Sequence, residues 1–543
     1  MPKVWSSCIH IRERSLLSRR KPLFKESDCM QQESRVKKTL LNARVNLIFY
    51  FLTLALAFFS RKIFLNSLGA EFVGFTGTLS NLLGFLNLAE LGISTAIGYV
   101  LYKPLFEQDQ QKINEIISVF GYLYRQVGKF ILITGSILSI FLPFIFPDTG
   151  IDLSVIYLAY YSFLGSSLIG YFINYRQTLL GADQKNYVVT AYFQTGNIIK
   201  TIIQMTLAYY TANYYIWISI EFIFGIIYSF ILNWKINQVY PWLSSDIQSG
   251  KLLNQKYPEV MKYTKQLFVH KIAALVQFQT TPFLIYAFVS LQTVAFYGNY
   301  SLITDKLKQL FDSFLGSTAA GIGNLIAEGN KEQIVKVYWE MMSLRFLIVG
   351  IATISLYHLL PPFIGLWLGQ EYVLSDSVLI LALIIFALGV IRGTTDQFIY
   401  GYGLFYDTWA PAAESVIFIV VAFIGGTLWQ LEGILLGSIV SLLVIVYGWK
   451  PYFLFKKGLK LPIRIYWQNV LKLIFTTFIT FISINSLNRW TTMNQGMDNW
   501  KDFITFAIYT VVSLSLIHFI LLYIGTRSMR TLVQRLIHKS KKS

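Results

Sequence analysis

Apolar stretches long enough to cross a lipid bilayer recur along this chain, and they constrain its fold more than any other feature. A spanning helix needs roughly 20 mostly apolar residues. Hydrophobic residues make up 55% of the chain and charged residues only 14%, far below the roughly one quarter that is charged in soluble proteins. The pattern predicts an all-α integral membrane protein with about fourteen transmembrane helices. We place these spans at residues 45–66, 72–101, 120–146, 153–175, 187–209, 214–234, 266–289, 294–325, 340–361, 376–400, 409–428, 430–454, 467–487 and 503–524.

Basic residues alternate between successive loops. Most lysines and arginines follow even-numbered spans, whereas the loops at 147–152, 209–214 and 369–376 contain none. Basic loops stay on the cytosolic side of a membrane. The alternation therefore predicts a multi-pass plasma-membrane protein with both termini in the cytoplasm. It also accounts for the net charge of +18 without nucleic acid as a partner.

An internal repeat indicates how the spans are organised. A shift of 221 residues aligns Phe75 with Phe296 and Glu107 with Glu328. Six spans per unit would give two pseudo-symmetric lobes of the same orientation. We expect a basic polar tail over 1–40, a first six-helix lobe over 41–237, a cytosolic linker over 238–265, a second six-helix lobe over 266–457, two extra spans over 458–526 and a basic C-terminal tail over 527–543.

Metal, disulfide and catalytic motifs do not stand out. Cys8 and Cys29 both precede Met30, and the five histidines are scattered. Residues 1–29 are either a cytosolic tail or lie upstream of a native start at Met30. The chain has no Asp-x-Asp motif and no phosphate-binding loop. We therefore expect no cofactor and no enzymatic activity.

Glu90 is the only ionised side chain expected between Phe72 and Tyr102. A carboxylate at membrane depth is energetically costly, which makes it a candidate functional group. Its span contains several glycines, which permit close packing or local unwinding. Three interpretations remain open: Glu90 lines a hydrated cavity, pairs with a basic residue on a neighbouring helix, or faces lipid.

A second charged group lies in the predicted span 294–325. Asp305, Lys308 and Asp312 share one helical face at spacings of three and four residues. That face should contact protein or water, with an intrahelical Lys308–Asp312 pair as the simpler interpretation. Arg392 and Asp396 form a further i, i+4 pair in span 376–400.

Basic side chains at membrane depth suggest an anionic substrate. The candidates are Arg125, Lys200, Arg345 and Arg392, together with Arg61 at the end of the first span. Guanidinium groups bind phosphate with two hydrogen bonds, and lysine binds it as a point charge. Arg61 could instead extend to the headgroup region. We take Arg61, Glu90, Arg125, Lys200, Asp305, Lys308, Asp312, Arg345, Arg392 and Asp396 as the candidate cavity residues.

Four motifs resemble a known family of membrane proteins. Three segments resemble the first two spans of polysaccharide flippases: residues 61–74 (RKIFLNSLGAEFVG), 88–93 (LAELGI) and 101–104 (LYKP). The loop at 179–187 (LLGADQKNY) also resembles these flippases. These flippases form the O-antigen and capsule branch of the multidrug/oligosaccharidyl-lipid/polysaccharide exporter superfamily. The resemblance covers roughly residues 40–460, and no motif assigns the basic cavity residues one to one.

The resemblance implies translocation of a polyprenyl-diphosphate-linked oligosaccharide from the inner to the outer leaflet by alternating access. Its expected partners are membrane lipid, the lipid-linked oligosaccharide and a polysaccharide polymerase or glycosyltransferase. An ion-coupled multidrug or small-molecule exporter of the same fold is the alternative, with Na⁺ or H⁺ as the coupling ion. A membrane oligosaccharide polymerase or glycosyltransferase is a more distant alternative, because the predicted outside loops are short.

Overall fold

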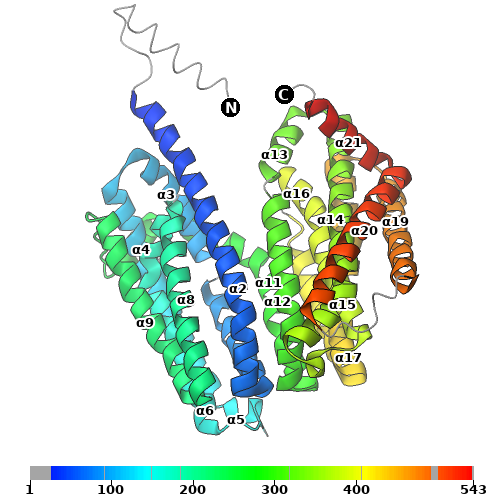
Figure 1. Cartoon of the computed structure of the whole chain (residues 1–543). Helices are drawn as coiled ribbons and strands as arrows, with labels where there is room; N and C mark the ends of the chain where they lie inside the picture. Colours follow the sequence, from blue (N-terminus) through cyan, green and yellow to red (C-terminus); the bar gives the residue numbers. More distant parts are fainter. Residues whose placement is uncertain are drawn as a thin grey trace, which may run out of the picture. The chain divides into compact units, whose positions relative to one another are not determined.

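All regular secondary structure in the part of the chain that the structure describes is helical (Figure 1). This computed structural model describes residues 26–90, 92–147, 149–183, 185–316, 318–404, 406–490 and 499–540. Up to residue 239 the elements are α2 (Glu26–Gly84), η1 (Phe85–Glu90), α3 (Ile93–Glu107), α4 (Gln110–Ser139), α5 (Leu142–Ile145), α6 (Leu153–Phe172), η2 (Asn174–Arg176), α7 (Gln177–Ala182), α8 (Asn186–Thr211) and α9 (Tyr214–Val239).

The second half of the chain continues the helical pattern. Its elements are α10 (Gly250–Lys256), α11 (Pro258–Phe288), α12 (Leu291–Gly316), α13 (Ala319–Glu328), α14 (Lys331–Trp367), η3 (Gln370–Tyr372), α15 (Asp376–Ile391), α16 (Gly393–Gly401), α17 (Trp409–Ser441), η4 (Leu442–Trp449), α18 (Lys450–Phe453), η5 (Leu454–Leu459), α19 (Ile463–Trp490), α20 (Trp500–Gly525) and α21 (Arg527–Ser540).

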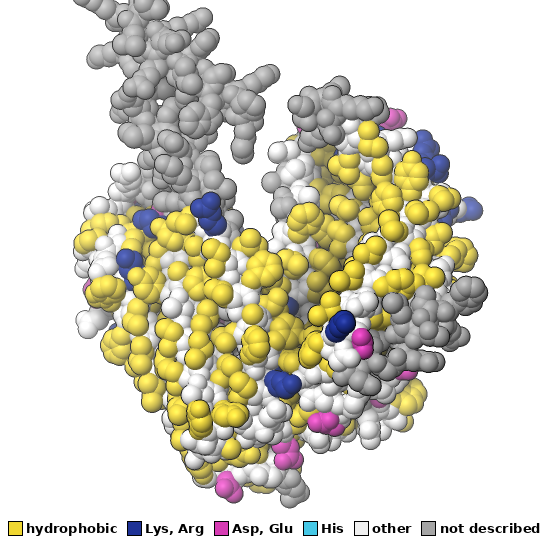
Figure 2. Space-filling model, viewed as in Figure 1, with side chains coloured by type: hydrophobic (Ala, Val, Ile, Leu, Met, Phe, Trp, Pro, Cys, Tyr) yellow, Lys and Arg dark blue, Asp and Glu magenta, His cyan; other side chains and the backbone are white. Residues whose placement is uncertain are grey.

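Many of these helices are suited to a lipid environment. Within the described residues, nine helical segments are long and apolar enough to cross a membrane. Figure 2 shows hydrophobic side chains over most of the visible face of these helices. Large apolar side chains such as Phe144, Tyr210 and Ile524 are exposed, as expected where lipid replaces water. The protein is an all-α integral membrane protein; the count of fourteen spans and the orientation of the termini stay predictions.

Local kinks separate predicted spans that follow one another without a loop. Gly69 has φ 82° and interrupts α2 between the predicted spans 45–66 and 72–101. Gln430 has φ 50° and interrupts α17 between the predicted spans 409–428 and 430–454. Positive φ is a glycine conformation, so Gln430 is the more unusual of the two. Each kink lies where two predicted spans meet, beside polar residues.

Several predicted spans are not single helices, among them two that contain candidate site residues at or near the break. The span 72–101 consists of the end of α2, the 3₁₀ helix η1 and α3, and the span 294–325 consists of α12 and α13. Gly92 has φ 96° immediately before α3, a conformation that side chains with a Cβ rarely adopt. In the predicted span 72–101, Gly92 therefore permits the break between η1 and α3. Glu90 is the last residue of η1 and lies at this break.

The helices form two compact units. Unit 1 comprises the described residues up to Ile63 with Ala89–Phe141 and Tyr157–Leu267, and unit 2 comprises Phe64–Leu88, Leu142–Ile156 and the described residues from Phe268 onward. This division differs from the predicted lobes because two segments of the lobe 41–237 belong to unit 2.

Two close contacts explain why these segments belong to unit 2. Gly74 packs directly against the Leu291 carbonyl, where a Cβ would overlap it. Phe146 stacks on Tyr286 with a centroid distance of 5.2 Å. Both contacts join segments of the predicted first lobe to helices of the predicted second lobe.

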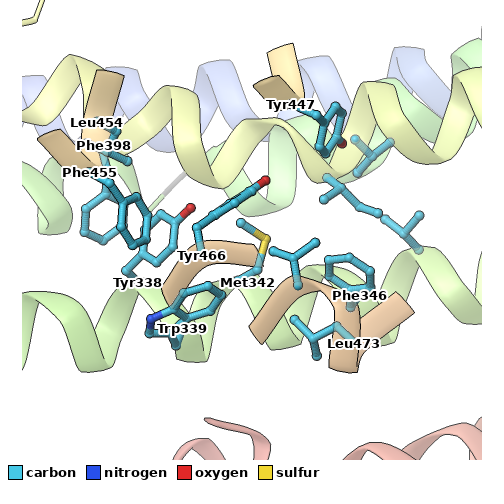
Figure 3. Packing of buried hydrophobic residues seen from close by; sticks show 14 of the residues in the cluster. Tyr338, Trp339, Met342, Phe346, Phe398, Tyr447, Leu454, Phe455, Tyr466 and Leu473 are labelled. Carbon is cyan, nitrogen blue, oxygen red and sulfur yellow. The ribbon is translucent and has the colours of Figure 1, made fainter. Parts of the chain in front are cut away.

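The core of unit 2 is built around α14. Tyr338 and Trp339 on α14 pack edge-on against Phe455, and Trp339 also contacts Tyr466 of α19 (Figure 3). The two predicted extra spans are α19 and α20, and both pack on α14. His518 of α20 is fully buried and connects all three helices, because its ring nitrogens lie 2.8 Å from Thr480 Oγ1 and 3.1 Å from the Phe346 carbonyl.

The segments predicted as polar tails contain helix. The helix α2 begins at Glu26, inside the predicted tail 1–40; residues 1–25 lie outside the described residues. Residues 527–540 of the predicted C-terminal tail form α21, which packs on α14. Met529 and Leu532 are buried in the unit 2 core, and Arg535 Nη1 lies 3.0 Å from the buried Glu340 carboxylate. The helix α21 is amphipathic, and its apolar face packs against the unit 2 core.

Candidate functional site

Glu90 is held by two tyrosines of unit 1. Tyr124 of α4 donates a hydrogen bond to Glu90 Oε1, and Tyr171 of α6 donates one to Oε2 over 3.0 Å. The two phenol rings pack together with centroids 5.3 Å apart. No basic residue in the described part of the chain pairs with Glu90. The carboxylate at the η1–α3 break is therefore stabilised by neutral donors rather than by the basic partner we considered.

Lys200 is neutralised inside unit 1. Its Nζ on α8 lies 2.6 Å from Glu221 Oε1 on α9. Gln204, which is 2% exposed, donates to Glu221 Oε2 and to the Trp217 carbonyl, each over 3.1 Å. The pair fixes α8 against α9, so Lys200 does not present an unpaired positive charge.

A cavity lies beside this ion pair, within unit 1. It has a volume of about 550 Å³ and is lined by α6, η2, α7, α8 and α9. Lys200 and Glu221 form part of its wall, with amide, hydroxyl and aromatic side chains around them. Glycines at 170, 196 and 225 leave room between the helices. The cavity wall is therefore mostly apolar, with polar groups distributed over it and no unbalanced charge.

Unit 2 contains a chain of four charged side chains. Arg392 Nε lies 3.0 Å from Asp396 Oδ2, and Arg392 Nη1 lies 3.5 Å from Glu414 Oε1. Lys450 Nζ approaches Asp396 Oδ1 to 2.7 Å. The i, i+4 spacing of Arg392 and Asp396 anticipated the first contact. Glu414 and Lys450 come from α17 and α18, and the four formal charges sum to zero.

Arg345 lies against the α15–α16 break. It is 2% exposed, and its Nη1 donates to the Val390 carbonyl over 2.9 Å. A helix end leaves such carbonyls without an intrahelical partner. Gly393 makes room for the guanidinium, because a Cβ there would lie 2.7 Å from Arg345 Nη1. Arg345 Nε makes no hydrogen bond to any described residue.

The charged face of α12 contains an intrahelical pair. Lys308 Nζ lies 2.6 Å from Asp312 Oδ2, with 33% and 44% of the two side chains exposed. The Lys308 stem runs past Gly389 of α15, where a Cβ would lie 3.3 Å from Lys308 Cε. Asp305 is exposed. The structure thus contains the simpler of the two arrangements considered for Lys308 and Asp312.

Two of the basic candidates lie outside these clusters. Arg125 is exposed on α4 and forms no ion pair among the described residues. Arg61 is half-buried on α2. The structure therefore brings Arg392 and Asp396 into one network, keeps Lys200 in a separate ion pair, and leaves Arg125 apart from both.

The loop motif at 179–187 has a structural contact network. Asp183 lies 2.6 Å from Lys185 Nζ and accepts a 2.8 Å hydrogen bond from the Tyr240 hydroxyl. Lys185 also lies over the Tyr240 ring, 4.7 Å from its centroid. Burial and the Asp183 carboxylate raise the pKa of the Tyr240 phenol, so it stays a donor. The motif joins the start of α8 to the end of α9.

Sequence reasoning missed several partners. Tyr124 and Tyr171 were two among 34 tyrosines, and Lys450 looked like an ordinary basic loop residue. These three residues lie on other helices than Glu90 and Asp396. The sequence does not specify which helices contact each other, so it could not identify them as partners. Glu340 was also missed, although it is fully buried beneath Arg535.

Comparison with solved structures identifies the fold. The chain superposes on lipid II flippase MurJ in an inward closed conformation with a TM-score of 0.61 and 16% identity, covering 88% of this chain and 98% of that one. An inward-facing multidrug resistance MATE family transporter of the MOP superfamily gives 0.55 and 14% identity, covering 77% and 99%. No protein-family model and no curated protein matches the sequence.

Proposed function

We infer that this protein is a transporter or flippase, because it shares its fold with MurJ and MATE proteins. We propose that this protein moves a polyprenyl-diphosphate-linked oligosaccharide from the inner to the outer leaflet by alternating access. Cell-surface polysaccharide export is the process such transport would serve. A polysaccharide polymerase or glycosyltransferase would be its functional partner.

The observation that carries this proposal is the network of Arg392, Asp396, Glu414 and Lys450 in unit 2. Four charged groups inside predicted membrane spans are costly and need a compensating role. Arg392 and Lys450 are the groups able to engage a diphosphate, by bidentate and point-charge contacts respectively. Asp396 and Glu414 neutralise them while no anion is present.

Leaflet transfer in proteoliposomes tests the proposal. Purified protein would be reconstituted with a fluorescent polyprenyl-diphosphate oligosaccharide, and outer-leaflet label would be quenched over time. We expect protein-dependent exchange, slowed about tenfold or more by Arg392→Gln, because a charge-assisted contact is lost. Transfer at the protein-free rate with glucose-, galactose- and N-acetylglucosamine-initiated lipids would contradict the proposal.

An ion-coupled exporter is the second candidate, and Glu90 is the observation that favours it. A carboxylate at a helix break, bonded only to neutral tyrosines, can take up a proton or Na⁺. Uptake of a labelled organic cation driven by a Na⁺ or pH gradient, and abolished by Glu90→Gln, would support this function. The same assay with Glu71→Gln, an exposed acid on α2, is the matched control.

A further inference from the structure

The cavity of unit 1 has the dimensions of a ligand site. Its volume of about 550 Å³ falls within the range of roughly 300–1,000 Å³ that is usual for small-molecule pockets. It lies entirely within unit 1, between α6, α8 and α9, and shares no residue with the Arg392 network. It is therefore a second candidate binding region, and its residues differ from those of the Arg392 network.

The walls of this cavity offer hydrogen-bonding groups that the protein does not use. The amides of Gln177, Gln194 and Asn197 line it and make no hydrogen bond to any described residue. Ser166 Oγ is buried and also has no partner among the described residues. Each amide carries two donor sites and two acceptor sites. The three amides are partly exposed to the cavity, so a ligand or water there can satisfy their hydrogen-bonding capacity.

Neighbouring polar residues show the contrast. Asn174 donates to Ser229 Oγ over 2.9 Å and accepts from Asn233 over 3.1 Å. This set is satisfied internally and ties η2 to α9. The cavity thus has one structural amide cluster at its edge and a second set of amides facing open space.

The charge balance of the cavity limits the ligand. Lys200 and Glu221 are its charged lining residues, and they neutralise each other at 2.6 Å. A diphosphate would lack a free cation there, and a metal ion would lack a free carboxylate. A neutral ligand with many hydroxyl groups could hydrogen-bond to the pair and to the amides without disturbing the charge balance.

Aromatic rings complete the chemistry. Phe193 of α8 and Tyr228 of α9 both line the cavity and meet edge to face, with centroids 5.1 Å apart. The Tyr228 hydroxyl makes no hydrogen bond to a described residue. Flat apolar rings beside amides and hydroxyls complement a sugar, which has apolar C–H faces and a polar rim.

We propose that the unit 1 cavity between α6, α8 and α9 binds a neutral sugar of the transported glycan. This inference rests on the proposed function and adds to it a place where the carbohydrate, rather than the diphosphate, is recognised. Gln194 and Asn197 bond the sugar hydroxyls, Phe193 and Tyr228 cover its apolar face, and the Lys200–Glu221 pair supplies one polar wall.

Binding to the full-length protein in nanodiscs tests this assignment. The probes are bare polyprenyl diphosphate, the same lipid carrying glucose, galactose or N-acetylglucosamine as its first sugar, and the corresponding free sugars. We expect at least one glycan lipid to bind about tenfold tighter than the bare lipid. The variant Gln194→Leu/Asn197→Leu should lose that preference and keep its affinity for the bare lipid.

Controls separate binding from folding and from the proposed function. Tyr228→Phe removes one oxygen atom and should weaken the glycan preference by a few fold, whereas Thr195→Val, on the exposed side of α8, should not. Equal binding of bare and glycan lipids by the unaltered protein would overturn the sugar site and leave the flippase proposal standing. No binding of any lipid would overturn both. Loss of ²²Na⁺ binding in the double variant, with lipid binding unchanged, would identify a cation site instead.

Discussion

The two units handle buried polarity in opposite ways. In unit 1, one ion pair is closed on itself and the remaining cavity wall is neutral, with amides that have no partner in the described residues. In unit 2, four charges from the α15–α16 junction, α16, α17 and α18 are linked through Arg392 and Asp396. In our proposal this difference divides recognition, with neutral groups of unit 1 binding sugar and charged groups of unit 2 binding diphosphate.

Removing Asp396 should have the largest effect on this comparison. Asp396→Ala leaves Lys450 unpaired and Arg392 with only the longer Glu414 contact, and breaking a buried pair costs about 3–5 kcal/mol. Thermal unfolding in detergent should show a large loss of stability. Asp312→Ala, in the more exposed pair, is the matched control. Equal losses of stability in both variants would mean that the Arg392 network contributes no more to stability than the more exposed Lys308–Asp312 pair.

The tyrosines that hold Glu90 should rank next. Tyr124→Phe or Tyr171→Phe removes one donor from a partly buried carboxylate, which should cost about 1.5–3 kcal/mol. Adding Glu90→Gln to either variant should recover part of the loss, because a neutral amide tolerates a missing donor better. Unfolding curves that are unchanged by both single substitutions would refute this account of the Glu90 site.

A double-mutant cycle measures the closed ion pair of unit 1. Lys200→Met and Glu221→Leu should each destabilise the protein, and the double variant should lose less than their sum by about 0.5–3 kcal/mol. Unfolding free energies of all four proteins supply the coupling. Strict additivity would show that Lys200 and Glu221 do not act as a pair, and the cavity would then contain usable charge.

The α12 pair should matter least. Lys308→Ala removes an i, i+4 contact between side chains that are one third and nearly one half exposed, and such pairs contribute about 0.3–0.5 kcal/mol. Its unfolding midpoint should stay close to that of the unaltered protein. A loss of stability comparable to that of Asp396→Ala would mean that Lys308 is coupled to the Arg392 network.

Local features of the fold were accessible from sequence, whereas contacts between helices were not. Apolar stretches predicted the membrane helices, and i, i+4 spacing anticipated the Arg392–Asp396 and Lys308–Asp312 contacts. The spacing could not specify Glu414 or Lys450 as partners, because that depends on how each helix is rotated towards its neighbours. The break after Glu90 was also hidden, since glycine permits unwinding but does not require it.

The amides of the unit 1 cavity also could not be identified from the sequence, because the cavity depends on contacts between helices. Gln194 and Asn197 are ordinary polar residues in the sequence of α8, and nothing in their spacing distinguishes them from solvated positions. Their significance appears only when α6, α8 and α9 enclose a space beside the Lys200–Glu221 pair. The sequence shows which residues are polar, but only the packing of the helices determines which of these residues face a cavity.

One transport measurement tests the division of roles between the units most directly. Leaflet transfer of a glycan lipid and of bare polyprenyl diphosphate would be compared in Gln194→Leu/Asn197→Leu and in Arg392→Gln, with Thr195→Val as the control. We predict that the unit 1 variant slows only the glycan lipid, whereas the unit 2 variant slows both. Equal slowing of both lipids by both variants would contradict separate recognition of sugar and diphosphate.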